Sequence, residues 1–192
     1  MVLDAKEVLY SILKEMGKDK IESEIVSSPS QIPVVIKEIF SRCVNSLQTN
    51  ADGQKMQSDI AEALMHYLLT VTMLPSERKI KHGDIEIDLV IPNGKQLHDD
   101  PQRALVIFFP KSIKMDDINA RLDKLLKAQP NRSNIWMVCG YYDDTLHSFN
   151  EYTIFVQDDF ADKSLKPLSS IIDAIKYFVE KNKIKSFRIF PT

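Results

Sequence analysis

Several features that often reveal a protein's function are scarce in this sequence of 192 residues. Only five glycines are present, and no glycine-rich phosphate loop occurs among them. The two cysteines, Cys43 and Cys139, stand alone inside apolar segments, which favours buried thiols over a disulfide framework or a zinc site. GxSxG, HExxH and paired CxxC motifs are missing, so serine-hydrolase, zinc-protease and thioredoxin-like chemistry lacks its usual signature.

Long apolar runs and a strongly basic composition are also missing. No window approaches the roughly 18 consecutive apolar residues of a membrane span, and the N-terminal segment lacks the basic start and apolar stretch of a signal peptide. We therefore expect a cytoplasmic chain with no membrane partner. The net charge is −2, but residues 163–192 carry seven Lys/Arg and two Asp/Glu, a local net charge of +5. This basic segment is either a phosphate-contacting face or an ordinary solvated surface.

The first part of the chain reads as helical. Apolar residues from Leu9 to Met16 recur at helical spacing and Gly17 follows as a C-cap, while a second apolar stripe runs from Ile36 to Leu47. Nothing strand-like precedes residue 77. We therefore predict an N-terminal helical extension over residues 1–52 and an α/β core over residues 53–192. The extension packs either on the core or on a second copy of the chain, which would form a homodimer.

The core alternates between helical and strand-like patterns. A helix is predicted from Met56 to Val71, and it is followed by the strand-like runs ERKIKH, DIEIDLVI and RALVIFF. The last run is nearly all apolar, as expected of a strand buried on both faces. A helix in KMDDINARLDKLLKAQP, strands in NIWMVCGYY and EYTIFVQ, a helix over residues 168–182 and a short strand in SFRIF complete the chain. This order predicts a central mixed β-sheet flanked by helices.

Polar side chains that are candidates for catalysis or metal binding lie on three of these elements. Asp59, Glu62 and His66 share one face of the helix that begins near Met56, because they are spaced three and four residues apart. Asp88 lies within EIDLVI, and Lys111 follows the apolar run VIFFP. Each of these residues also has a plain structural interpretation, since acids on a half-exposed strand and a lysine after a buried strand are common where a sheet meets solvent.

With Asp88 in EIDLVI and Lys111 in VIFFPK, the stretch from Met56 to Gln157 resembles the PD-(D/E)xK nuclease superfamily, which includes restriction endonucleases and Holliday-junction resolvases. The resemblance implies a restriction-endonuclease-like fold. It also implies Glu62 as the helix acid, Asp88 as a metal ligand and Lys111 as the residue that orients water or faces phosphate. In such a site two carboxylates hold Mg²⁺, which lowers the pKa of a bound water and stabilises charge on the scissile phosphate.

The sequence departs from the superfamily pattern where the second acid should stand. The position two residues before Lys111 is Phe109, and Pro110 lies between them. Phenylalanine cannot bind a metal, so either the carboxylate has moved or catalysis is lost. Three sets of residues offer a replacement: Asp84 and Glu86 in the strand of Asp88; Asp116, Asp117 or Asp123 in the following helix; and the pair Glu62 and His66.

Two classes of function follow. The first is a nucleic-acid-associated protein with a nuclease-like fold, which binds DNA or RNA and is more readily interpreted as catalytically degenerate. If it is active, it is a Mg²⁺-dependent endonuclease that uses Lys111, Asp88 and Glu62, with Asp88, Glu86 and Asp123 as candidate metal ligands. The second is a non-enzymatic protein–protein interaction or dimerisation module built on the N-terminal helices.

Overall fold

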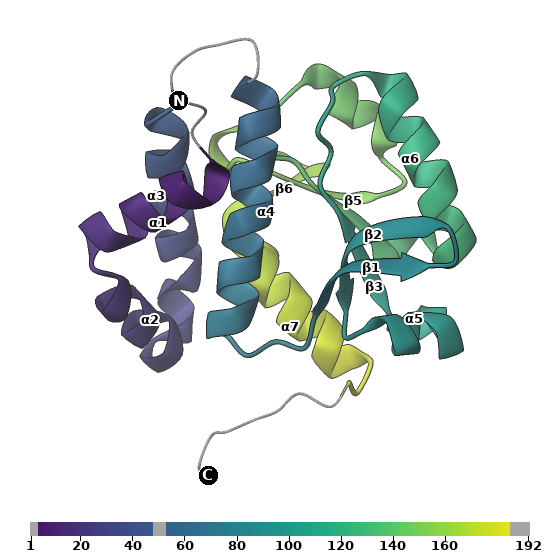
Figure 1. Cartoon of the computed structure of the whole chain (residues 1–192), viewed down its shortest axis with the longest axis horizontal. Coiled ribbons are helices and arrows are strands. Elements are labelled where there is room, and N and C mark those ends of the chain that lie inside the picture. The colour runs from purple at the N-terminus through teal and green to yellow at the C-terminus, as the bar shows by residue number, and fades with distance from the viewer. Residues whose placement is uncertain (1–3, 48–52, 185–192) are drawn as a thin grey trace.

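A mixed β-sheet of six strands forms the centre of the molecule (Figure 1). The computed structural model describes residues 4–47 and 53–184. The strands are β1 (Glu77–His82), β2 (Ile85–Ile91), β3 (Leu105–Phe108), β4 (Ile135–Val138), β5 (Thr153–Val156) and β6 (Leu165–Pro167), and they lie side by side in this order. Strand β2 is antiparallel to its neighbours β1 and β3, and the strands from β3 to β6 are parallel. The expected mixed sheet flanked by helices is confirmed.

Helices cover both faces of this sheet. The longer helices are α1 (Ala5–Met16), α2 (Lys18–Ser27), α3 (Ile32–Asn45), α4 (Gly53–Val71), α6 (Met115–Ala128) and α7 (Ile171–Lys181), and α5 (Gly94–Asp99) is a short one. Helices α1 to α4 and α7 belong to one apolar cluster, on one face of the sheet, while α6 belongs to a second cluster on the other face (Figure 1). In the described residues, no helix is both long and apolar enough to cross a membrane.

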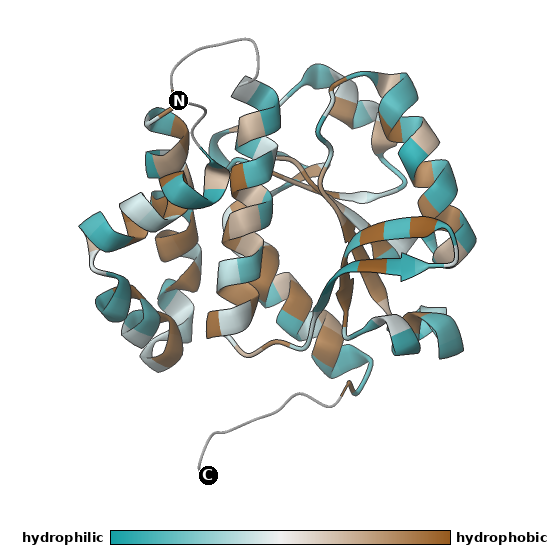
Figure 2. Ribbon diagram, in the orientation of Figure 1, coloured by the Kyte–Doolittle hydropathy of each residue, from teal (hydrophilic) through white to brown (hydrophobic). Residues whose placement is uncertain are grey.

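The central strand β3 shows how the sequence builds these two layers. Its four residues are all buried, as the apolar run predicted. Leu105 and Ile107 pack toward α4, whereas Val106 and Phe108 pack toward α6, because successive side chains of a strand point to opposite faces. Figure 2 shows the apolar residues concentrated along the strands and on the helix sides that face them.

The N-terminal helices form part of the same hydrophobic core. The buried residues of α1, among them Leu9 and Leu13, join the cluster that also contains residues of α4 and α7. Gly17 ends α1 with a φ of 85°, which confirms the expected left-handed C-cap. The apolar faces of these helices are therefore buried within the chain itself.

Three elements were not anticipated from the sequence: α2, α5 and β6. Helix α2 buries only Ile21 and Ile25, so its apolar stripe is too short to stand out in a highly charged segment. Strand β6 has three residues, one of them Pro167, which is a poor strand former. The strand expected in SFRIF lies outside the described residues.

The pairing of β1 with β2 is interrupted at one position. The regular register pairs Arg78 with Leu89 and Ile80 with Ile87, but Lys79 and Asp88 between them are not paired. Lys79 has a φ of 49°, a conformation that lysine rarely adopts. Ile87 and Leu89 consequently pack into different clusters although they are two residues apart. Asp84, offered by the sequence as a replacement acid in the same strand as Asp88, lies in the β1–β2 turn, before β2 begins.

Candidate functional site

Asp88 and Lys111 lie at one end of the sheet and line the same pocket. This pocket has a volume of about 260 Å³ and is bounded by β2, the residues after β3 and the first half of α6. The fold thus brings together two residues that are 23 positions apart in the sequence. Arg121, which the sequence had not singled out, lines the pocket with them.

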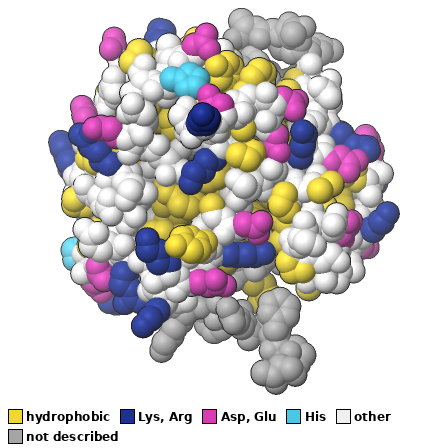
Figure 3. Space-filling view, turned by 180° about the vertical axis from the view of Figure 1, so that it is seen from behind, with side chains coloured by type: hydrophobic (Ala, Val, Ile, Leu, Met, Phe, Trp, Pro, Cys, Tyr) yellow, Lys and Arg dark blue, Asp and Glu magenta, His cyan; other side chains and the backbone are white. Residues whose placement is uncertain are grey.

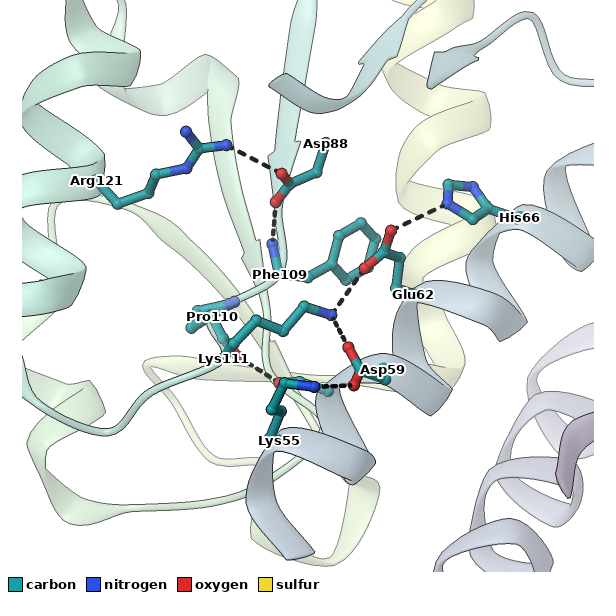
Figure 4. Close-up of polar contacts among 10 residues, drawn as sticks. Lys55, Asp59, Glu62, His66, Asp88, Phe109, Pro110, Lys111 and Arg121 are labelled. Atoms are coloured by element: carbon teal, nitrogen blue, oxygen red, sulfur yellow. Dashed lines mark hydrogen bonds and ion pairs between the residues drawn. The ribbon is translucent and has the colours of Figure 1, made fainter. Parts of the chain in front are cut away.

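Both carboxylate oxygens of Asp88 accept hydrogen bonds from the protein (Figure 4). The backbone N–H of Phe109 donates to Oδ2 over 3.1 Å, and Arg121 Nη2 donates to Oδ1 over 3.0 Å. The Arg121 and Asp88 side chains retain 24% and 25% exposure, so this ion pair is only partly screened by water. Asp88 is therefore fixed by a guanidinium group from α6.

Lys111 forms a second ion-pair network with helix α4. Its Nζ lies 2.7 Å from Asp59 Oδ1 and 2.7 Å from Glu62 Oε2 (Figure 4). Lys55 also contacts Asp59, with Nζ 3.2 Å from Oδ2. The two acids of α4 therefore converge on a single ammonium group, and their negative charges are compensated by cations of the chain.

Glu62 is strongly held in its ionised form. His66 Nε2 lies 3.5 Å from Glu62 Oε1, and neither buried ring nitrogen of His66 has a hydrogen-bond partner of standard geometry among the described residues. The neighbouring His66 ring and the Lys111 ammonium lower the pKa of Glu62 to about 2, although burial opposes this shift. Glu62 therefore carries a full negative charge at neutral pH.

Asp88 has the opposite tendency. Burial raises the pKa of its carboxyl above the ordinary value, and the negative charge of Glu62 adds to that effect. The Phe109 N–H and the Arg121 guanidinium lower the pKa and so act against burial. Arg121 thus helps to keep a carboxylate charged in an environment that favours its neutral form.

A close contact fixes α4 against the end of the sheet. The Ser58 hydroxyl donates a hydrogen bond to the Pro110 carbonyl oxygen. Just after β4, Gly140 lies directly under α4, where a Cβ atom would come within 2.1 Å of the Gln57 carbonyl oxygen. The absence of a side chain at position 140 therefore allows α4 to bring Asp59 and Glu62 to Lys111.

The residues present do not fit the Mg²⁺ ion that the fold implies. Such an ion needs free carboxylate oxygens, and those of Asp88 already accept hydrogen bonds from Phe109 and Arg121. Phe109, at the position expected to hold the second acid, is 1% exposed and part of the hydrophobic core. Among the described residues, no group of three or more Asp, Glu, His or Cys side chains is arranged to hold a metal ion.

Two of the other candidate ligands, Glu86 and Asp123, do not line this pocket. Glu86 is exposed on β2, opposite Lys81 of β1. Asp123 is exposed on α6. Asp117 does line the pocket, where it accepts a hydrogen bond of 2.7 Å from the Ser112 hydroxyl. Asp88, Glu86 and Asp123 consequently do not form a three-ligand metal group.

Sequence patterns revealed only part of this network. Asp59, Glu62 and His66 were recognisable by their helical spacing. Arg121 was missed because nothing near it in the sequence marks it, and its partner Asp88 is 33 residues away. The helical periodicity of α6 is the pattern that comes closest to identifying Arg121, because it places Arg121 at the edge of the buried stripe of Ile118, Leu122 and Leu125.

The fold and the position of the site define a restriction-endonuclease-like α/β protein. The restriction endonuclease PspGI, solved with its substrate DNA, superposes with a TM-score of 0.63 and 13% identity, covering 94% of each chain. Metal-depleted Ecl18kI with uncleaved, modified DNA superposes with a TM-score of 0.60 and 11% identity, covering 97% of this chain and 82% of that one. A second Ecl18kI complex, with uncleaved DNA, gives a TM-score of 0.56.

These similarities include the N-terminal helices, since they extend over nearly the whole chain. At such low identity they establish the fold alone. The search of protein-family models found no match, and the search of curated proteins found none either.

Proposed function

We propose that this protein binds DNA and does not cleave it. The observation that carries the proposal is the engagement of Asp88: both of its oxygens are bonded to protein donors, one of them the Arg121 guanidinium. In this proposal the Arg121 guanidinium stands beside Asp88 instead of the divalent metal ion that a nuclease of this fold would require. In the same proposal, the ion pairs of Lys111 with Glu62 and of Asp88 with Arg121 are structural and do not form a catalytic centre.

The choice of DNA as the ligand rests on the fold. PspGI and Ecl18kI, the endonucleases of similar structure, were both solved as DNA complexes. The net charge of −2 shows that any nucleic-acid contact must use a local basic surface rather than the charge of the whole molecule. A fold can persist after its chemistry has been lost, so binding without cleavage is physically consistent.

The proposal can be tested with a fluorescent duplex pool of random sequence. Binding is followed by anisotropy at low salt, in EDTA and in Mg²⁺, and the recovered DNA is then examined for new ends. We expect equal binding in both conditions and intact DNA. Cleavage that disappears in Asp88→Asn would show that the protein is a nuclease, whereas no binding at low salt would refute DNA as the ligand. A matched RNA duplex serves as the comparison.

A further inference from the structure

A second polar pocket lies beside the ion-pair network, on the side of the edge strand β1. It has a volume of about 460 Å³ and is lined by the start of α1, one face of α4 and the middle of β1. Asp59 and Glu62 line this pocket and also bind Lys111. The pocket is therefore joined to the first one through the ion pairs of Asp59 and Glu62 with Lys111.

The cations of this pocket differ from those of the network in having no acidic partner. Lys6, Arg78 and Lys79 are exposed and line the pocket, and none of them forms an ion pair with any described residue. Lys111, Arg121 and Lys55, in contrast, are all paired with carboxylates. The positive charges of β1 thus remain available to an anion from outside.

The acids in the same pocket do not cancel this charge. Three acids line it, Asp4, Asp59 and Glu62, against the three cations already named. Asp59 and Glu62 are bonded to Lys111 and Lys55, and Asp4 caps the N-terminus of α1 by accepting from the Lys6 backbone N–H. Because Lys55 and Lys111, which lie outside the pocket, neutralise Asp59 and Glu62, the three cations of the pocket are opposed only by Asp4. This surface suits an anion.

The backbone also distinguishes β1. Lys79 holds a φ of 49° at the position where pairing with Asp88 is interrupted. Strained conformations of this kind tend to occur at binding sites, where the surrounding structure maintains them. Here the strain accompanies two consecutive exposed cations, Arg78 and Lys79, on a strand that forms the edge of the sheet. On the face seen from behind Figure 1, acidic and basic side chains are intermixed (Figure 3).

We infer that Arg78 and Lys79, together with Lys6, bind the phosphate backbone of duplex DNA. This inference rests on the proposed function and specifies the surface that carries it out. The contacts are made to phosphates and carry no sequence information by themselves, because charged side chains of an edge strand reach the backbone without reading a base. They place the DNA beside the ion-pair network of Asp59, Glu62 and Lys111.

The test compares two double variants of equal charge. Arg78→Ala/Lys79→Ala removes the proposed contacts, and Lys124→Ala/Lys127→Ala removes two exposed lysines from α6, on the other face of the sheet. Affinity for one fluorescent 24-base-pair duplex is measured by anisotropy over a range of salt concentrations. Thermal unfolding of each variant confirms that the fold is intact. Lys79→Arg is a third variant that retains the charge.

We expect the β1 variant to bind at least tenfold more weakly than the wild type. Its plot of log affinity against log salt should be shallower by roughly 1.8, because each lost phosphate contact removes about 0.9 from the slope. The α6 variant and Lys79→Arg should bind like the wild type.

If the β1 variant bound the duplex as tightly as the wild type, the role of this surface would be refuted. The proposed function would be unaffected. Equal weakening in the two double variants would also refute the role of this surface, since only the net charge would then matter. Failure of the wild-type protein to bind any duplex at low salt would refute both the proposed function and this inference.

Discussion

At the scale of single residues, the site is governed by the balance between burial and ion pairing. Glu62 and Asp88 are both partly buried carboxylates, yet the pKa of one is lowered and that of the other is raised. The difference follows from their partners. Glu62 has the His66 ring and the Lys111 ammonium nearby, whereas the partners of Asp88 only partly offset its burial.

Replacing Glu62 by Gln should reduce stability in a way that depends on pH. Because folding lowers the pKa of Glu62 from 4.5 to about 2, its charge contributes up to roughly 3 kcal/mol above about pH 5. The sign follows from the direction of the shift: the contribution is complete above the unfolded pKa and is lost as the pH falls from 4.5 toward 2. Urea unfolding at a series of pH values measures it.

Glu38→Gln is the matched control for this experiment. Glu38 also forms an ion pair on a helix, with Arg42 at 2.7 Å, but both side chains are about half exposed. An exposed pair of this kind contributes about 0.5 kcal/mol or less. Equal losses of stability in Glu62→Gln and Glu38→Gln at every pH would show that the pairing of Glu62 with His66 and Lys111 does not stabilise the fold.

At the scale of secondary-structure elements, the site depends on how closely α4 approaches the sheet. Gly140→Ala should destabilise the protein by about 1–3 kcal/mol, because the added methyl group would overlap the Gln57 carbonyl. Gly53→Ala is the control, since a Cβ at this position of the same helix meets nothing within 4 Å. Thermal unfolding of both variants measures the difference. Equal stability would contradict the close packing of α4.

The interruption in β1 permits a second prediction at this scale. Lys79→Gly should be more stable than Lys79→Ala by about 1 kcal/mol, because glycine adopts a positive φ without steric cost. Both variants lack the cation, so both should lose the same DNA affinity. Chemical unfolding and anisotropy together separate the backbone effect from the charge effect. A more stable alanine variant would contradict the strained conformation of Lys79.

At the scale of the whole molecule, periodicity predicted most of the architecture. The buried strand β3, the amphipathic helices and the mixed sheet follow from patterns that extend over several residues. Single irregularities escaped detection. Polar and apolar residues alternate from Asp84 to Leu89, yet the structure breaks that alternation at Asp88, because the unpaired position opposite it, Lys79, leaves no mark in the pattern.

The candidate site was predictable only as far as local spacing allowed. Helical and strand periodicity identified Glu62, Asp88 and Lys111 as candidate site residues. The pairing of Arg121 with Asp88 depends on how α6 packs beside β2, and the role of Gly140 depends on its contact with a helix more than 80 residues earlier in the chain. Contacts between distant segments of this kind are set by tertiary packing and carry no local sequence signal.

Self-association through the N-terminal helices stays a prediction. The inner faces of α1 and α3 are buried in the core, so a second copy would have to bind their outer faces. Tyr10 and Val34 are 53% and 60% exposed there. Light scattering over a range of protein concentrations would measure the oligomeric state.

In the proposed function, Arg121 takes the place of a metal ion beside Asp88. Mn²⁺ binding, followed by electron paramagnetic resonance, tests this role of Arg121 most directly. We expect no stoichiometric binding by the wild type. Arg121→Glu should acquire weak binding, with a dissociation constant of roughly 0.1–1 mM, because two carboxylates would then face one another. Arg42→Glu, which places two acids together on the exposed surface of α3, should not acquire it. If the wild type bound Mn²⁺ stoichiometrically and Asp88→Asn abolished this binding, Arg121 would not be taking the place of a metal ion.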